Sequence, residues 1–455
     1  MGDQNGRKKI VWRVILVFQV MIIACNGYIQ QFNEMNQMTR YLVTKKSIPS
    51  MLHWSSNRRS RPRKGLFAET RAKRSLKGSS WQGSSSPLSM SSSYLDSLSS
   101  SPDASSPPIV SSNKVTPEDL KKRPDWAPDW APTWAVTLSP VKQVLIVLIA
   151  YALHLGVFCR TSINLPFQLF PNRAGFFQAL GLDSLAGIIS LALFCFAKGK
   201  NGHRPIAPVE GPWKVSKTAT TQIKVFYTTV ILCIAYLSSG YGAGLWENFL
   251  FVLADIGVPI TTPMHRSLQV LLAHLSWVFM GMYILGSSFK PFFSKQTKWM
   301  KMKWRSIWVW WTLGGYFLSA FVFNLCDVAN QFLLPEKFFE VETVVSKMIN
   351  PENNDILAMA VGSIAPCMTA PWWEEVLYRG YILPALTSWL PQKWAIPVSG
   401  ILFAVHHMNM AGMIPLMGLG FLWALLYVRS QNLVVTIIIH AMWNSRVFLG
   451  SYLGV

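Results

Sequence analysis

The sequence predicts an all-α, polytopic integral membrane protein with about eight or nine transmembrane helices. Of its 455 residues, 51% are hydrophobic and only 14% are charged, a balance typical of chains that cross a membrane several times. Apolar stretches long enough to cross or nearly cross a bilayer recur along the chain. Basic residues gather at the N-terminus and between these stretches, as expected beside membranes.

The apolar stretches fall into two groups. Six lie at about 143–159, 176–197, 225–243, 268–288, 307–326 and 356–373, and three more at about 394–408, 411–428 and 432–449. We expect each to be a membrane helix, because the bilayer core requires about 20 predominantly apolar residues in an α-helix.

The charges between the stretches alternate in sign. Six basic residues and one acid lie in 198–224, and six basic residues and no acid in 289–305, whereas 327–355 holds six acids and two bases. The positive-inside rule therefore puts the two basic loops on one side of the membrane and predicts that Glu374, at the end of the sixth stretch, lies near that side. The net charge of +21 then suits a membrane, and we expect no nucleic-acid partner.

The N-terminal part divides by composition. Residues 1–27 resemble a signal sequence, with a basic start and an apolar run, although an uncleaved anchor has the same features. Residues 28–124 hold twelve basic residues and one acid between positions 40 and 77, and 17 serines among the 34 positions 79–112, so we expect disorder. Residues 125–355 begin with an interfacial Trp- and Pro-rich lead-in and continue as N-terminal membrane helices, and we expect 356–455 to form the core of the same membrane domain.

The first two segments together resemble the two-part presequence of proteins imported into plastids bounded by extra membranes. This predicts a plastid membrane, thylakoid or envelope. The alternative is a disordered tail on a protein of the endoplasmic reticulum or another secretory membrane.

A charged group interrupts the apolar C-terminal region at PWWEEVLYRG, residues 371–380. A charge near the bilayer centre costs about 2.5–3.5 kcal/mol on insertion scales, so pairing or function is expected. On a helix, Glu375 and Arg379 share a face and can pair, while Glu374 points about 100° away. One glutamate is thus held by a partner and the other stays free. An ion pair that only joins two helices is the structural alternative.

Two further polar groups follow in apolar stretches. The first is FAVHH, with Phe403, His406 and His407, and the second is HAMWN, in which His440 and Asn444 share a helix face. A carboxylate, imidazoles and an amide within 71 residues suit a hydrolase that activates water. A transporter with an intramembrane proton relay is a further alternative.

Glu-Glu-x-x-x-Arg, Phe-x-x-x-His and His-x-x-x-Asn, in this order, resemble the CAAX protease and bacteriocin-processing family, which includes type II CAAX prenyl endopeptidases and lysostaphin resistance protein A-like proteins. Residues 383–386 (LPAL) and 440–445 (HAMWNS) look like its cyanobacterial and plastid branches. The resemblance covers roughly residues 356–450 and implies an intramembrane endopeptidase. It implies that Glu374 and His407 activate water, and that His440 and Asn444 stabilise the oxyanion.

The remaining motif residues would support the site: Glu375 and Arg379 by orienting it, with Phe403 beside them. We interpret His406 as structural. The resemblance implies a metal-independent mechanism, so we expect no metal and no cofactor, although members have also been described as metalloproteases. The sequence lacks the His-Glu-x-x-His motif of zinc proteases.

The expected partners are the lipid bilayer and a membrane-associated protein or peptide substrate. Although the family name refers to prenylated proteins, a plastid location would disfavour them. The rival interpretation is a non-proteolytic scaffold or chaperone-like protein that retains the protease fold.

Overall fold

A computed structural model describes residues 132–164, 179–200, 209–335, 339 and 344–453. The signal-like segment, the basic Ser-rich segment and most of the Trp- and Pro-rich lead-in lie outside the described residues. The regular secondary structure of the described part is helical except for one short antiparallel pairing, in which β1 (Ser162–Asn164) aligns Ile163 with Leu180 of β2 (Ala179–Gly181).

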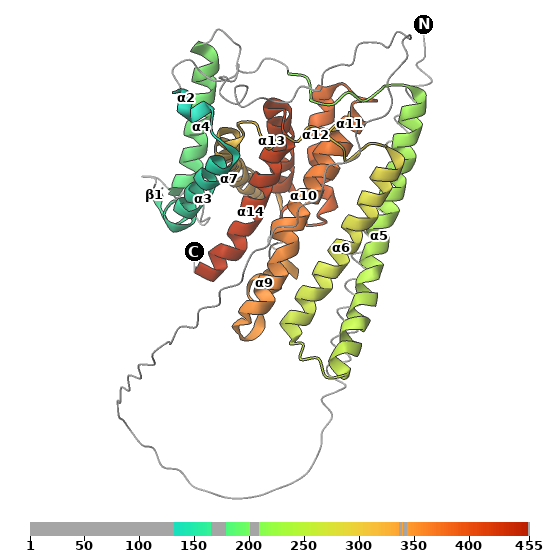
Figure 1. Cartoon of the computed structure of the whole chain (residues 1–455). Helices are drawn as coiled ribbons and strands as arrows, with labels where there is room; N and C mark the ends of the chain where they lie inside the picture. The colour runs from blue at the N-terminus through green and yellow to red at the C-terminus, as the bar shows by residue number, and fades with distance from the viewer. Residues whose placement is uncertain (1–131, 165–178, 201–208, 336–338, 340–343, 454–455) are drawn as a thin grey trace, which may run out of the picture. The chain divides into compact units, whose positions relative to one another are not determined.

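The N-terminal helices come first along the chain (Figure 1). They are α2 (Thr133–Val136), α3 (Pro140–Gly156), η1 (Phe158–Arg160), α4 (Leu182–Lys200), α5 (Ala219–Asp255), α6 (Thr262–Ser288) and α7 (Val309–Leu333).

The C-terminal helices follow. They are α8 (Val344–Ile349), η3 (Glu352–Asn354), α9 (Ile356–Ile364), η4 (Ala365–Thr369), α10 (Ala370–Glu375), η5 (Val376–Ile382), α11 (Leu383–Leu386), α12 (Gln392–His406), α13 (Met413–Ser430) and α14 (Leu433–Leu453).

A helix overlaps each of the nine predicted stretches, which confirms the all-α membrane fold. Among the described residues, seven helical segments are long and apolar enough to cross a membrane: Pro140–Arg160, Ala219–Asp255, Thr262–Ser288, Val309–Leu333, Ile356–Leu386, Met413–Ser430 and Leu433–Leu453. The other two are α4, whose apolar part is Leu182–Phe196, and α12 with 15 residues.

The predicted end of the sixth span at residue 373 is wrong. The helix continues through α10, η5 and α11 to Leu386 as one candidate span. Glu374 therefore lies inside the span, roughly 18 Å before its C-terminal end at 1.5 Å per residue. The charges of Glu375 and Arg379 end an apolar window in the sequence, but they do not end the helix because they are paired inside the protein.

A buried amide joins α3 to the start of α7. Gln143 is fully buried, and its Oε1 accepts hydrogen bonds from the main-chain N–H groups of Trp308 and Val309 at 2.8 and 3.1 Å. Its Nε2 donates to the carbonyl of Ser306 at 2.9 Å. The first N–H groups of a helix have no main-chain partner, so this side chain satisfies them where water is absent.

Helices α12 and α13 touch through glycine. A Cβ added to Gly400 would lie 2.7 Å from the main-chain nitrogen of Phe421, and one added to Gly420 would lie 2.9 Å from the Cα of Gly400. Small residues allow such main-chain approach between membrane helices. The contact fixes the position of Gly420 along α13 relative to α12. The carbonyl of Gly420 belongs to the site described below.

We expect Gly400→Ala to destabilise the protein by about 1–3 kcal/mol, because the added methyl group must separate two main chains. Gly244→Ala is the matched control, since a Cβ at Gly244 of α5 meets no atom within 4 Å, and alanine favours the helix. Thermal denaturation in detergent would measure both. Equal stability of the two variants would contradict this packing.

Candidate active site

The acidic motif lies where one helix changes its hydrogen-bonding period. Glu374 and Glu375 end α10, which is flanked by two π-helical segments, η4 and η5, and Arg379 lies in the second. Such π segments occur frequently at functional sites. Within α10 the two adjacent glutamates point about 100° apart around the helix axis.

Glu375 and Arg379 form a buried ion pair. Arg379 Nη1 donates to Glu375 Oε1 at 2.8 Å, and both side chains are almost fully buried. Arg379 Nη2 donates to the carbonyl of Gly420 in α13 at 3.1 Å. The guanidinium carbon lies 4.7 Å from the ring centre of Phe403 and 5.5 Å from that of Trp423. One arginine thus joins α12 and α13 to the acidic motif.

His440 of α14 is held by the same carboxylate. Its Nδ1 lies 3.2 Å from Glu375 Oε1, and its ring centre lies 4.5 Å from that of Trp423. An ionised carboxylate only accepts hydrogen bonds, so we assign the Nδ1 proton to this contact. The other nitrogen, Nε2, then faces Glu374 at 3.9 Å.

His407 is oriented by the end of α12. Its main-chain N–H donates to Ala404, so the carbonyl of Phe403 lacks that partner, and His407 Nδ1 lies 2.8 Å from this oxygen. A carbonyl only accepts, which places the ring proton on Nδ1. This explains the four-residue spacing of the Phe-x-x-x-His motif. His407 Nε2 then faces Glu374 Oε2 at 3.6 Å.

Glu374 therefore lies between two imidazoles without a direct hydrogen bond to either. Its Oε2 is buried and unpartnered within the described part of the chain, and distances of 3.6 and 3.9 Å to the two Nε2 atoms exceed hydrogen-bond length. The side chains of Glu374 and His407 keep 13% and 28% exposure, whereas His440 keeps 2%. The site is therefore more exposed on the side of His407 than on the side of His440.

Asn444 points to a different acceptor. Its Nδ2 donates to the carbonyl of Pro366 in η4 at 2.8 Å. That carbonyl lacks a main-chain donor, because the N–H of Ala370 donates to Ala365 and the next residue, Pro371, has no N–H. Glu374, His407 and His440 thus lie close together. Asn444 lies one helical turn beyond His440 and hydrogen bonds to a free carbonyl of the helical segment that leads to Glu374.

Residues 356–446 match the family model described as type II CAAX prenyl endopeptidase Rce1-like. This segment is an Rce1-like domain. It contains all seven predicted site residues, and its family is a protease family. The curated proteins and the solved structures gave no match.

Two residues of the site have no signal in the sequence. Trp423 of the Rce1-like domain contacts both Arg379 and His440, and its Nε1 donates to Ser319 of α7 at 3.0 Å. It is one of 20 tryptophans, so composition could not single it out. His274 of α6 lies outside the domain. It lies close enough to Glu374 to act on its charge through space.

His406 lies beside the Rce1-like site and packs against aromatic side chains. Its ring centre lies 4.4 Å from that of Tyr236 in α5, and neither ring nitrogen has a hydrogen-bond partner among the described residues. This packing agrees with a structural role. Within the same part of the chain, no three His, Cys, Asp or Glu side chains form a group that could hold a metal ion.

Removing one member of the buried pair should destabilise the Rce1-like domain strongly. We expect Arg379→Met or Glu375→Gln to cost about 3–5 kcal/mol, because each leaves a buried charge unpaired. The double variant should cost less than the sum of the two single variants. Thermal denaturation in detergent would measure these changes.

Arg266→Gln is the control for this prediction. It breaks a more exposed pair, in which Arg266 Nη2 and Glu352 Oε1 lie 3.6 Å apart, and such pairs contribute roughly 0–1 kcal/mol. If Arg379→Met lowered the stability no more than Arg266→Gln, the buried pair would not hold these helices together as we expect.

Proposed function

We propose that this protein is an intramembrane endopeptidase that hydrolyses a membrane-proximal peptide bond with water activated by Glu374 and His407. The observation that carries the proposal is the unpaired Glu374 oxygen, 3.6 Å from His407 Nε2 and 3.9 Å from His440 Nε2. The Rce1-like domain supports a peptidase of the membrane. A carboxylate oxygen without a hydrogen-bond partner among the described residues is suited to act as a base.

The proposed reaction begins with a water between Glu374 and His407. The water oxygen attacks the peptide carbonyl carbon while its proton moves to Glu374, and a tetrahedral oxyanion forms. Glu374 then returns the proton to the nitrogen of the leaving amine as the carbon–nitrogen bond breaks. Neutral His407 presents a lone pair at Nε2, since its proton lies on Nδ1, so it can accept a hydrogen bond from the attacking water.

His440 is the proposed oxyanion donor. Because its Nδ1 proton is directed to Glu375, donation from Nε2 requires the doubly protonated imidazolium. The resemblance gives Asn444 the same role. Its amide has two N–H donors, and Pro366 accepts from Nδ2 through one of them, which leaves the second for the oxyanion.

The substrate and the location are part of the proposal. The basic and Ser-rich N-terminal sequence favours a plastid membrane, where a membrane-associated peptide without a prenyl group would be the substrate. The endoplasmic reticulum is the alternative location.

We expect Glu374→Gln to reduce peptide hydrolysis by at least about 100-fold, because it keeps the shape of the side chain and removes the base. Glu352→Gln is the control, since Glu352 is 64% exposed and contacts Arg266. The measurement compares protein termini in native membranes of cells that carry each variant. Uncut precursors should accumulate only with Glu374→Gln.

The same comparison tests the scaffold interpretation. If cells with Glu374→Gln were indistinguishable from wild type while deletion of the whole protein had a phenotype, the protein would act without proteolysis. The proposed chemistry would then be wrong.

A chelator should leave the proposed activity intact. We expect purified protein to cleave a membrane-anchored peptide equally well before and after dialysis against a strong zinc chelator, because the proposed base is a carboxylate and not a metal-bound hydroxide. Lasting loss of cleavage that only added zinc restores would contradict the glutamate mechanism.

A further inference from the structure

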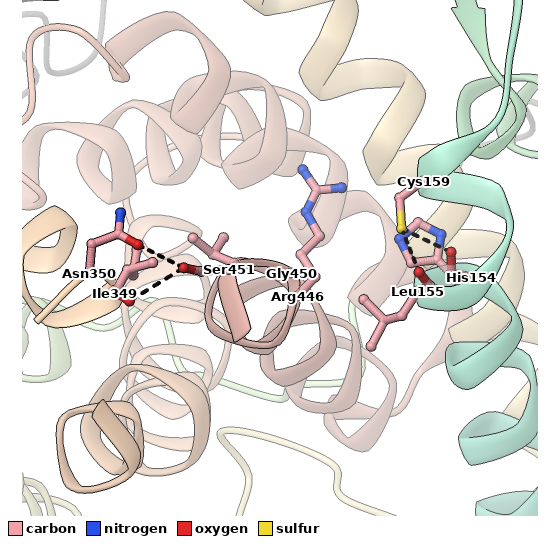
Figure 2. Close-up of a pocket in the computed structure, with 9 residues that line it drawn as sticks. His154, Leu155, Cys159, Ile349, Asn350, Arg446, Gly450 and Ser451 are labelled. Carbon is pink, nitrogen blue, oxygen red and sulfur yellow. Dashed lines mark hydrogen bonds between the residues drawn. The ribbon is translucent and has the colours of Figure 1, made fainter. Parts of the chain in front are cut away.

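We infer that a second site, formed by α3, α14 and the segment after α8, binds the phosphate headgroup of an anionic membrane lipid. A cavity of about 330 Å³ lies there, and it does not involve Glu374 or His407. Its polar lining comes from His154, Cys159, Asn350, Arg446 and Ser451. Figure 2 shows Arg446 extending from α14 between the residues of α3 on one side and Asn350 with Ser451 on the other.

Arg446 is a cation without an anion. Its guanidinium carbon lies 3.5 Å from the ring centre of Trp443 and 5.8 Å from that of Phe323. Within the described part of the chain, no side chain forms an ion pair with it and no oxygen accepts its hydrogen bonds. The nearest acid in electrostatic terms is Asp183 at the start of α4. Five N–H donors in a planar fork suit a phosphate.

His154 is a second unsatisfied group that lines the same cavity. Its side chain is 1% exposed, and neither ring nitrogen has a hydrogen-bond partner among the described residues. Its ring is held by aromatic neighbours, with centres 5.1 Å away in Tyr316 and 5.8 Å away in Phe317. A buried polar group without a partner costs free energy. Both ring nitrogens are closed to solvent, so we expect the ring to turn toward the cavity when a phosphate oxygen accepts its N–H.

The far side of the cavity offers neutral donors. Ser451 Oγ lies 2.8 Å from Asn350 Oδ1 and 3.4 Å from the carbonyl of Ile349. Ser451 thus links the end of α14 to the segment after α8. The Ser451 hydroxyl donates its one proton within this group, which orients Asn350 and leaves the amide N–H groups of Asn350 as donors to a phosphate oxygen opposite α3.

The position of the cavity favours a lipid. His154 and Cys159 lie in the last seven residues of the span Pro140–Arg160, and Arg446 and Ser451 in the last eight of Leu433–Leu453. Helices leave the hydrocarbon at their ends, which is the level of the headgroups. Apolar side chains of α3 and α14 beside the cavity are exposed, namely Leu153, Val157, Val447 and Leu449. The acyl chains of the lipid would cover these side chains while its phosphate occupies the cavity.

A second arginine lies nearby. Arg160 follows α3 and its Nη2 donates to the carbonyl of Leu453 at 3.2 Å, so it joins the ends of the same two helices. Its positive charge adds to the attraction for an anionic headgroup. The site is separate from the proposed peptidase chemistry, because Arg446 lies six residues, or ~9 Å along α14, beyond His440.

The test is native mass spectrometry of the full chain in detergent, titrated with dioleoylphosphatidylglycerol or with dioleoylphosphatidylcholine. We expect tighter binding of the anionic lipid, and Arg446→Gln should weaken it about tenfold or more through loss of charge-assisted hydrogen bonds. Arg446→Lys should retain more of the binding than Arg446→Gln. His154→Phe keeps the aromatic packing and removes both ring nitrogens, so it should weaken binding severalfold.

Arg266→Gln is the matched control, because Arg266 already contacts Glu352, and we expect unchanged binding. If Arg446→Gln fails to fold, the loss of binding in His154→Phe decides the question. Equal binding of the anionic lipid by wild type, Arg446→Gln and His154→Phe would overturn the site. Displacement of the lipid by millimolar inorganic phosphate would assign the cavity to a free anion and overturn the lipid assignment.

Discussion

The buried ion pair of Glu375 and Arg379 is the interaction on which the C-terminal helices depend. Arg379 gives its hydrogen bonds to Glu375 and to Gly420 in α13, and its guanidinium lies near the rings of Phe403 and Trp423. The same Glu375 oxygen faces His440 of α14. Because an unpaired charge in the bilayer is costly, these helices can pack in few other arrangements. The pair thereby fixes where His440 and Phe403 lie.

The two adjacent glutamates have opposite environments. Oε1 of the fully buried Glu375 faces both an arginine and an imidazole, whereas no hydrogen bond holds Glu374 among the described residues. Oε2 of each glutamate is buried without a partner in the same part of the chain. One carboxylate organises the protein, and the other is the proposed base. A proline also leaves a main-chain group in this helix without its usual partner. Pro371 frees the carbonyl of Pro366, and Asn444 satisfies it from α14.

Arg446 presents the reverse situation at the other end of α14. Glu374 is an acid between two imidazoles, and Arg446 is a cation held by aromatic rings beside a polar cavity. Both are ionisable groups in an apolar setting, and in the described structure neither forms a hydrogen bond to a charged side chain. In membranes such groups mark sites for ligands or reactions more often than sites of packing alone, and the two lie on one helix or against it. The proposed hydrolytic site and the proposed lipid site therefore share α14.

The sequence by itself determined the helical membrane fold, because apolar length and loop charge are local properties. It also determined the Glu375–Arg379 pair and the separation of Glu374 from it, since both follow from helical spacing. It could not predict that the sixth span continues to Leu386. An apolar stretch read from the sequence ends at charged residues, whether or not those residues are paired in the folded protein. Only the tertiary structure decided the direction of Asn444, the contacts of Trp423 and the cavity beside Arg446. These depend on side chains that lie far apart in the chain, and no local pattern specifies which of them meet.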